Sequence, residues 1–520
     1  MAEKLLEKEG QTYNNFPRTV TSLCPECTKL IKAVISIQGN NIVMDKTCQE
    51  HGPFKEILSN DKDFFLRMEK LRFGDGPGIL NPKTQEQKGC PLDCGLCNKH
   101  KSTTMMGVID LTNRCNLKCP ICFATSDASG YLYEPTFQQV KEMMLNLYNL
   151  KPAMAVCLQF SGGEPTLHPE FLDIIREARK IGFGQIQIAT NGITFNNEEF
   201  ARKASEAGLN CLYLQFDGVT DDVYTKIRGR PLFEMKKKAI TNSYKYGIRT
   251  ILVPTIVRGI NNQQIGDIYN FAINHIDPIS TISWQPVALT GRIPEEEKNQ
   301  MRFTITDLVK ETEKQFPFIK KEDWYPLAFT SPFSRFLDVV TGEMYSRLTC
   351  HSHCGAGTYL IVDTEKRKHI PLPRFVDVMG LMTKFQEIYK QHKNKKYFKK
   401  MRGKLGIFNF KKQLKEFYDE EKAPDNMSYK DFLSYLHEFT AKEYFTDNLF
   451  KKKTQQEQKW RILVVATMHF QDSYNYETER TKRCVVHYST PDGKMYPFCT
   501  YNAGPYFRTE VEKQFSKPLG

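Results

Sequence analysis

Fifteen cysteines constrain this 520-residue chain more than any other feature, because most of them stand in short-spaced groups. Two groups share the spacing Cys-x3-Cys-x2-Cys, one beginning at Cys90 and the other at Cys115. The N-terminus lacks the apolar core of a secretory signal, and no stretch approaches the roughly 20 apolar residues of a membrane-spanning helix. We therefore expect a cytoplasmic protein. Since the cytosol keeps thiols reduced, the cysteine groups indicate metal ligation rather than disulfides.

The composition, 40% hydrophobic and 26% charged, is typical of a folded protein, and the net charge is +13. A basic chain fits a partner that carries phosphate, either nucleic acid or an anionic lipid surface. No RNA-binding module is recognisable, so we expect no nucleic-acid partner. The stretch from Lys393 to Lys415 holds ten Lys or Arg and no acidic residue. Such a stretch can hold phosphate headgroups or form a solvated helix face.

Apolar, β-rich runs alternate with helical patterns between residues 106 and 288. The runs are MGVIDLTN (106–113), AVCLQFSG (155–162), GQIQIATNG (184–192), CLYLQFDG (211–218), TILVPTIV (250–257) and TISWQPVA (281–288). This alternation predicts an α/β fold with a parallel sheet covered on both faces, a partial TIM-like (β/α)6 barrel. We expect a metal module at 18–60, a linker with cluster cysteines at 61–104, the barrel at 105–300, and a helical, basic region with a C-terminal iron–sulfur domain at 301–520. Strands are expected again between about 458 and 510.

The second cysteine group, Cys115, Cys119 and Cys122, directly follows the first strand run. Three thiolates on one loop can hold three irons of a [4Fe–4S] cluster and leave the fourth iron open. The amino and carboxyl groups of S-adenosylmethionine (SAM) can chelate that open iron. The alternative, a structural zinc loop, leaves the SGGEP sequence at the end of the second run unexplained.

The N-terminal cysteines form a different pattern. Cys24-x2-Cys27 is followed by Cys48-x2-His51. Two such pairs make a closed site with four ligands, which suits tetrahedral zinc or a single rubredoxin-like iron. A module of this size needs its metal to fold, so we expect a structural role.

The remaining cysteines are assigned by grouping. An auxiliary [4Fe–4S] cluster can be ligated by four of them together: Cys350, Cys354, Cys484 and Cys499. His351, His353 and His487 are alternative ligands. The alternative without a cluster is that some of these cysteines are ordinary buried core residues. The group Cys90, Cys94 and Cys97 can hold another auxiliary cluster, whose fourth iron is open or bound by a side chain such as His100. Cys157 and Cys211 lie inside apolar runs and are expected to be core residues.

The CNLKCPIC loop and the GGEP run at 162–165 resemble the radical SAM superfamily. The resemblance implies that a [4Fe–4S] cluster on Cys115, Cys119 and Cys122 cleaves SAM to start radical chemistry. It also implies that Gly162, Gly163 and Glu164 bind the methionyl amino group of SAM. By the same resemblance, the residues that line the ribose or the substrate are Thr190, Asn191, Gln215 and Asp217.

The motifs CPEC/CQEH, GCPLDCGLCNKHKSTT, TNRCNLKCPICFA and PFCTYN together resemble the archaeal tetraether lipid synthases. That resemblance implies C–C coupling of the phytanyl ends of two archaeal diether phospholipids, contact with a membrane surface, and an unidentified reductant. It implies three [4Fe–4S] clusters and one mononuclear iron or zinc. The competing interpretation is a radical SAM methylase that acts on a soluble cofactor such as a pterin.

Overall fold

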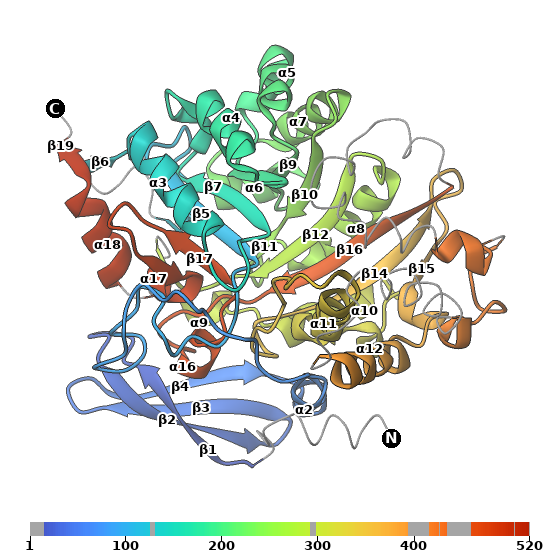
Figure 1. The fold of residues 1–520 in the computed structure, drawn as a ribbon, viewed down its shortest axis with the longest axis horizontal. Coiled ribbons are helices and arrows are strands. Elements are labelled where there is room, and N and C mark those ends of the chain that lie inside the picture. The colour runs from blue at the N-terminus through green and yellow to red at the C-terminus, as the bar shows by residue number, and fades with distance from the viewer. Residues whose placement is uncertain are drawn as a thin grey trace.

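The computed structural model describes residues 15–124, 130–291, 298–393, 415–425, 427–433, 459–503 and 505–518. Two sheets dominate it: a long curled sheet, and a four-stranded sheet that lies below it in Figure 1. The basic stretch from Lys393 to Lys415 lies outside the described residues except for its two ends. Within the described part of the chain, no helix has the length and apolar character needed to cross a membrane.

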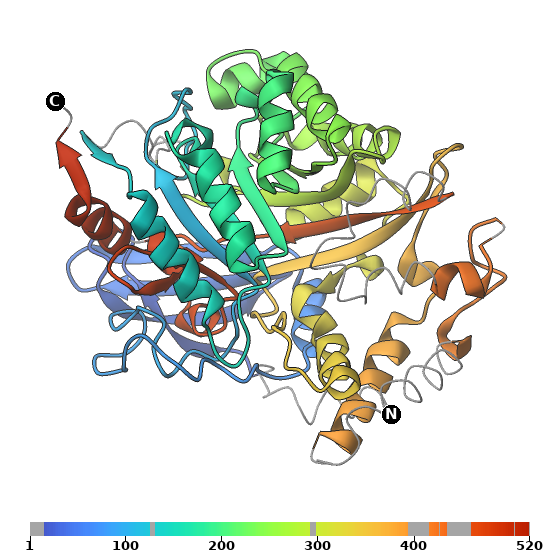
Figure 2. The same cartoon turned by 45° about the horizontal axis from the view of Figure 1, so that its top comes forward.

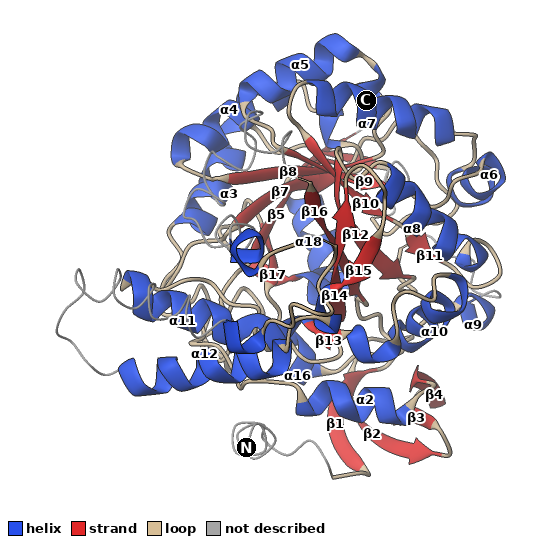
Figure 3. Cartoon of the chain, turned by 90° about the vertical axis from the view of Figure 1, so that its right-hand side faces the viewer, coloured by secondary structure: helices blue, strands red, loops and turns tan. Residues whose placement is uncertain are grey.

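Six parallel strands form the centre of the long sheet and confirm the predicted partial barrel. They are β5 (Met106–Thr112), β7 (Cys157–Gly162), β8 (Gln185–Thr190), β9 (Cys211–Gln215), β10 (Arg249–Val253) and β12 (Ile279–Pro286). Each coincides with one of the apolar runs. Helices cover the outer face of this half-barrel (Figure 3). They are α3 (Phe137–Tyr148), α4 (Phe171–Ile181), α5 (Glu198–Ala207), α6 (Asp221–Arg228), α7 (Phe233–Lys245) and α8 (Ile265–Asn274).

The strand residues alternate between the helix-covered face and the lumen, as the pleat of a strand requires. Phe160 of β7, Ile188 of β8 and Leu214 of β9 are fully buried in the core that the helices cover. Helix α4 shows the matching period of about 3.6, because Phe171, Ile174, Ile175 and Ala178 all face that core. It ends at Gly182, whose φ of +114° terminates the helix in the left-handed conformation.

Strands from the C-terminal third extend both ends of the barrel sheet. β16 (Trp460–Met468) pairs in parallel with β12 and antiparallel with β14 (Gly355–Asp363), while β17 (Val486–Ser489) pairs in parallel with β5. The expectation of strands between about 458 and 510 is only partly correct: β18 (Met495–Pro497) is short, and α17 (Phe498–Ala503) follows it as a helix. Short strands complete the sheets at β6 (Tyr131–Tyr133), β11 (Thr255–Ile256), β13 (Tyr325–Pro326), β15 (His369–Pro371) and β19 (Ser516–Pro518).

The four-stranded antiparallel sheet at the N-terminus is a separate module. Its strands are β1 (Arg18–Leu23), β2 (Leu30–Gln38), β3 (Asn41–Cys48) and β4 (Gly52–Ser59), followed by α2 (Lys62–Lys70). Arg302 fixes the module to the rest of the chain, because its Nε lies 2.9 Å from Glu56 of β4 and its Nη1 lies 2.6 Å from Asp472. The module therefore packs on the side of the molecule that carries α16 (Thr478–Thr481), as Figures 1 and 2 show.

A further helical layer lies beyond β14. It contains α11 (Ser331–Thr341) and α12 (Val378–His392). The short helix α9 (Lys298–Met301) precedes α10 (Ile305–Gln315), which packs against α8 and β4, and α18 (Pro505–Gln514) packs against α17 and β6 at the other end of the sheet. A cavity of about 220 Å³ lies between this layer and the sheet, lined by apolar side chains such as Phe333, Phe385 and Trp460. Its lining offers few hydrogen-bonding groups.

Candidate functional site

The cluster loop that carries Cys115, Cys119 and Cys122 begins three residues after β5 ends. The loop therefore lies at the carboxyl ends of the parallel strands, where such sheets place their sites. Burial raises the pKa of Cys115 to about 12, with the backbone of Leu117 opposing the shift. A buried thiol in this state is poorly ionised unless a cation binds it. Three thiols on one loop fit a [4Fe–4S] cluster with one open iron.

Two glycines let the end of β7 close onto the cluster loop. A Cβ on Gly162 would lie 2.2 Å from the carbonyl oxygen of Thr112, and one on Gly163 would lie 2.2 Å from that of Arg114. The backbone N–H of Gly163 donates to Thr112 at 2.8 Å, and that of Glu164 donates to Arg114 at 2.8 Å. Any side chain at these positions would push the two segments apart, so the GGEP run has a packing role next to the cysteines.

Glu164 connects this turn to the end of β8. Its fully buried carboxylate accepts hydrogen bonds from the Thr190 hydroxyl at 2.9 Å, the Asn191 N–H at 2.9 Å and the Thr166 hydroxyl at 2.7 Å. Burial raises its pKa, and these hydrogen bonds oppose the shift. Asn191 in turn donates through Nδ2 to Asn116 of the cluster loop at 2.7 Å. The ends of β7 and β8 and the cluster loop are thus held together by one hydrogen-bond network.

An ion pair ties the end of β9 to the same loop. Arg228, at the end of α6, donates to both carboxylate oxygens of Asp217, at 2.7 and 2.9 Å. Its Nη1 also donates to the carbonyl oxygen of Ile121, between Cys119 and Cys122, at 2.8 Å. Asp217 is fully buried and Arg228 is 8% exposed. The pair is bidentate and desolvated, so it fixes the loop firmly.

Lys236 of α7 is a second buried cation at the site. Its Nζ donates to the carbonyl oxygen of Asn191 at 2.6 Å and lies 3.2 Å from the Gln215 side-chain oxygen. Burial lowers its pKa to about 7, while the charge of Asp217 opposes the shift. Lys236 therefore links the ends of β8 and β9.

These contacts change the expectation for the residues assigned to SAM. The side-chain oxygens of Glu164, Thr190 and Asp217 are all engaged within the protein. The side chains of Asn191 and Gln215 are engaged as well, because Asn191 bonds Asn116 and the Ile193 N–H, and the Gln215 oxygen lies 3.2 Å from Lys236. All of these residues shape the mouth of the barrel. Arg228 and Lys236 were missed from the sequence, because only the fold brings them to the cluster loop. Asn116 was also missed, although it lies within that loop, because its partner Asn191 is distant in sequence.

The lumen of the half-barrel is lined by polar side chains. Gln187 donates to Gln159 at 2.6 Å across neighbouring strands, and Gln285 donates to the Tyr213 hydroxyl at 2.7 Å. The Tyr213 hydroxyl also lies 2.9 Å from that of Ser283. These residues alternate with the core-facing positions, so the hydrogen-bonding groups of four strands converge on one concave face.

A cavity of about 80 Å³ lies where this face meets the cluster loop. Its lining includes Ile121, Phe123, Arg228, Gln285 and Phe470. On its far side the rings of Phe123, Phe470 and Phe498 pack together, with centroids 4.1 to 6.0 Å apart. Because Phe123 follows Cys122 and Phe498 precedes Cys499, this aromatic cluster separates the two cysteine sites.

The structure brings the four C-terminal cysteines together from three segments. Cys350 and Cys354 precede β14, Cys484 precedes β17, and Cys499 lies in α17. The thiol of Cys354 interacts electrostatically with those of Cys350, Cys484 and Cys499. Burial raises the pKa of each of the last three, to about 11 for Cys499. This donor set fits a fully ligated cluster. His487 fits it less well, because Thr104 engages its Nδ1 at 2.9 Å and His100 its Nε2 at 3.1 Å.

The group at Cys90, Cys94 and Cys97 lies on a loop between α2 and β5. Asp93 shapes the loop by accepting hydrogen bonds from three consecutive backbone N–H groups, at 2.6 to 2.7 Å. Burial raises the pKa of Cys90 to about 12, and the charge of Lys482 opposes the shift. The Nε2 atom of His100 contacts the Cys484 carbonyl oxygen at 2.8 Å, which leaves only Nδ1 for a metal.

The N-terminal group forms a compact site. One ligand atom from each of Cys24, Cys27, Cys48 and His51 lies within 4.8 Å of all the others. His51 Nδ1 lies 3.8 Å from the Cys24 sulfur and 3.5 Å from that of Cys48. The contact with His51 lowers the pKa of Cys48 to about 6. This spacing fits one tetrahedral ion.

Outside the cysteine groups, Cys211 is buried, and Cys157 is partly buried in the barrel.

Comparison with known proteins follows this division of the chain. Residues 109–272 match the Radical SAM superfamily, and residues 16–60 match the HMPTM N-terminal zinc ribbon domain. A 7,8-dihydro-6-hydroxymethylpterin dimethyltransferase from Methanocaldococcus jannaschii is 40% identical over 96% of this chain and 95% of its own length. The chain belongs to the family of that radical SAM pterin dimethyltransferase.

More distant relatives match a smaller share of the chain. A probable GTP 3',8-cyclase from Methanothermobacter thermautotrophicus is 26% identical over 34% of this chain and 55% of its own length. Among solved structures, Streptococcus suis SuiB bound to its precursor peptide SuiA is 16% identical, with a TM-score of 0.34 over 41% of this chain and 46% of that one.

The family corrects two expectations from the sequence. The interpretation as a tetraether lipid synthase is wrong, and so is the expected partner, an archaeal diether phospholipid, since the full-length relative is named for a pterin substrate. The reason is chemical: the motifs that carried the lipid interpretation are cysteine and glycine motifs around cluster sites, and such residues do not identify the substrate. The superfamily, the partial barrel and the N-terminal ribbon are confirmed.

Proposed function

We propose that this chain is a radical SAM methylase whose substrate is a soluble reduced pterin. The observation that carries the proposal is the 40% identity to a pterin dimethyltransferase over nearly the full length of both chains. When bound, a [4Fe–4S] cluster on Cys115, Cys119 and Cys122 supplies the electron that cleaves SAM into a radical. The residues around it bind and orient the two small molecules.

The polar groups in the lumen favour a pterin over a substrate without hydrogen-bonding groups. A pterin ring is flat and carries several ring nitrogens, an amino group and a carbonyl, so it needs donors and acceptors at fixed positions. Gln159, Gln187 and Gln285 offer amide groups of both kinds on the concave face, and Tyr213 adds a hydroxyl. Phe123 and Phe470 border the adjoining cavity with apolar rings that can stack on a flat heterocycle.

The engaged side chains have a distinct task in this proposal. Glu164, Arg228 and Lys236 hold the strand ends against the cluster loop. Gly162, Gly163, Asn191 and Gln215 would contact SAM. Cys350, Cys354, Cys484 and Cys499 would hold one auxiliary [4Fe–4S] cluster and Cys90, Cys94 and Cys97 another, while the ribbon site would hold structural zinc.

Binding of the pterin to the lumen can be measured without turnover. The reconstituted, anaerobic protein should bind 7,8-dihydro-6-hydroxymethylpterin, and a Gln159→Leu, Gln187→Leu variant should bind it roughly tenfold more weakly or worse, because lost hydrogen bonds cost about 1–3 kcal/mol. Gln263→Leu, at an exposed position, serves as the control. No binding by the parent protein, or equal binding by the lumen variant, would argue against a pterin in the lumen.

A further inference from the structure

A short basic segment, Arg480 to Arg483, lies between the two groups of auxiliary cysteines. It comprises the end of α16 and the residues that lead directly into Cys484. Hydrogen bonds connect it to both groups: the Lys482 carbonyl oxygen accepts from the Lys101 N–H at 2.7 Å, shortly after Cys97, and the Cys484 N–H donates to Thr481 at 3.1 Å. The segment is thus part of the backbone that holds both sites.

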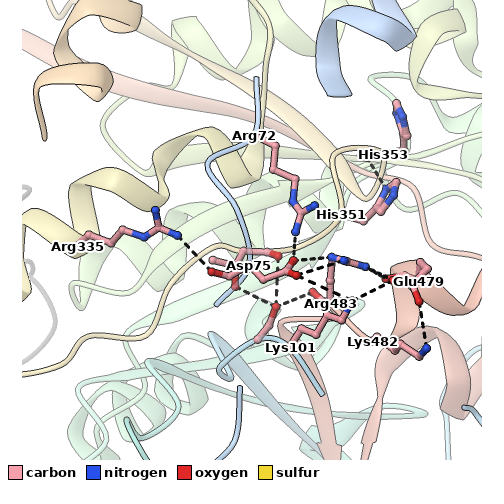
Figure 4. Close-up of polar contacts among 11 residues, drawn as sticks. Arg72, Asp75, Lys101, Arg335, His351, His353, Glu479, Lys482 and Arg483 are labelled. Atoms are coloured by element: carbon pink, nitrogen blue, oxygen red, sulfur yellow. Dashed lines mark hydrogen bonds and ion pairs between the residues drawn. The ribbon is translucent and has the colours of Figure 1, made fainter. Parts of the chain in front are cut away.

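The ion pairs around this segment contain more cations than carboxylates (Figure 4). Arg483 is fully buried and donates to both oxygens of Asp75, at 2.7 and 3.3 Å, and it also pairs with Glu479. Arg72 shares Asp75, and Lys482 lies 3.1 Å from Glu479. Lys101 lies 3.2 Å from Glu479 and 4.0 Å from Asp75. Four cations therefore share two carboxylates, which leaves a local excess of positive charge.

Arg480 faces the C-terminal cysteines. Its Nη2 donates to the carbonyl oxygen of His469 at 2.6 Å, and the His469 N–H donates to the carbonyl oxygen of Cys354 at 3.0 Å. The charge of the guanidinium also acts on the thiols of Cys354 and Cys499. Arg480 is 7% exposed, and its Nε has no hydrogen-bond partner among the described residues. A buried guanidinium with a spare donor beside two thiols fits a site that becomes anionic.

Lys482 faces the other group. Two positions along the chain from Arg480, its carbonyl oxygen accepts from the Lys101 N–H at 2.7 Å, and the neighbouring His100 N–H donates to the Cys97 carbonyl oxygen at 3.1 Å. Its charge therefore lies close enough to this group to act on Cys90. It pairs with Glu479, and its side chain is 27% exposed. Arg480 and Lys482 therefore belong to one segment but lie near different cysteine groups.

We propose that Arg480 and Lys482 are charge-tuning residues that set the reduction potentials of two auxiliary iron–sulfur clusters separately. Arg480 acts on the cluster at Cys350, Cys354, Cys484 and Cys499, and Lys482 on the cluster at Cys90, Cys94 and Cys97. Reduction adds one negative charge to a thiolate-ligated cluster, so a neighbouring cation stabilises the reduced form and raises the potential. The proposal rests on the two auxiliary sites and not on the identity of the substrate.

The test is a reductive titration of the full-length, reconstituted protein, followed by electron paramagnetic resonance without SAM or pterin. Signals are assigned from a Cys484→Ser, Cys499→Ser variant. Arg480→Gln should make the potential of the C-terminal cluster more negative, and Lys482→Gln should do so for the other cluster. Lys203→Gln, on α5 at the opposite end of the molecule from α16, removes the same charge from an exposed position and should shift neither (Figures 1 and 3).

Arg480→Lys separates charge from packing, because it keeps the cation and should keep the potential nearer to that of the parent. If Arg480→Gln loses iron, retention of iron by Arg480→Lys supports the charge role, and Lys482→Gln still reports on the other cluster. Unchanged potentials in both glutamine variants would overturn the proposal, as would both variants shifting the same signal equally. The titration does not depend on pterin turnover. A protein that fails to methylate a pterin would therefore contradict the proposed function and not this proposal.

Discussion

Arg228 and Asp217 form a buried, bidentate ion pair whose arginine also donates to the carbonyl oxygen of Ile121, inside the loop of cluster cysteines. The pair therefore holds the cluster loop in place against the end of β9. Arg228→Met should leave the buried Asp217 carboxylate without its ion-pair partner, although the Thr255 N–H still donates to it at 3.1 Å, and should destabilise the protein by about 3–5 kcal/mol. Reconstituted iron content and Tm should both fall. Arg202→Met, which removes an exposed arginine of α5, should leave both values near those of the parent.

The second prediction concerns the contact between the GGEP turn and the cluster loop. Gly163→Ala places a Cβ 2.2 Å from the Arg114 carbonyl oxygen, so the two backbones must separate, at a cost of about 1–3 kcal/mol. SAM affinity and 5'-deoxyadenosine formation should both fall. Lys203→Ala, at an exposed position of α5, is the control. Equal SAM binding by Gly163→Ala and the parent would show that this close approach is unimportant.

The third prediction uses the buried lysine of α7. Burial lowers the pKa of Lys236 to about 7, whereas the ordinary value is 10.5. Between these values the unfolded chain binds more protons than the folded one, so the contribution of Lys236 to stability rises with pH across that interval. The free energy of unfolding of the parent, relative to Lys236→Met, should therefore increase with pH in urea titrations. Lys203→Met should show no such trend relative to the parent, and a flat difference for Lys236→Met would contradict the assignment.

The fourth prediction concerns the auxiliary site at the C-terminus. Cys484→Ser combined with Cys499→Ser should lower the iron content by one cluster and spare SAM cleavage more than product formation. Cys211→Ser, at a buried cysteine outside the cluster groups, should leave the iron content unchanged. An iron count equal to that of the parent in the double variant would refute the site.

The fifth prediction addresses the ribbon module. His51→Ala removes one of four ligands that lie within 4.8 Å of one another, so the module should lose its single metal and melt earlier while the barrel stays folded. Elemental analysis should find one equivalent of zinc in the parent. His275→Ala, at an exposed histidine of α8, should keep that metal. Unchanged metal content in His51→Ala would show that His51 is not a ligand.

The sequence predicted local features well and long-range ones poorly. The six barrel strands were predictable because each is an almost continuous apolar run, as Leu212 and Leu214 of β9 illustrate. The groups at Cys24, Cys90 and Cys115 were predictable because their spacing is local. The insertion of β17 beside β5 was not, since it pairs Val486 with Met106 across most of the chain. Lys236 and Arg228 carry no motif, and their roles depend on what the fold places beside them.

The substrate was the hardest feature to predict, for a physical reason. The most distinctive motifs hold metals and shape the SAM site, so they are compatible with many substrates. The side chains that line the lumen, such as Gln159 and Tyr213, look like ordinary strand residues until the barrel forms. Only the full-length relative indicated which kind of molecule they face.

The central claim is that this chain transfers methyl groups to a reduced pterin by radical SAM chemistry. The most direct measurement supplies the anaerobic, reconstituted protein with reductant, 7,8-dihydro-6-hydroxymethylpterin and SAM labelled in its methyl group. A SAM molecule that is cleaved to 5'-deoxyadenosine keeps its methyl group on methionine, so the label must come from a second SAM, which leaves as S-adenosylhomocysteine. Labelled methylpterin and S-adenosylhomocysteine should therefore form alongside 5'-deoxyadenosine. A Cys115→Ala, Cys119→Ala, Cys122→Ala variant should form neither the methylpterin nor 5'-deoxyadenosine. If the parent protein cleaved SAM to 5'-deoxyadenosine while no label entered the pterin, the claim would be contradicted.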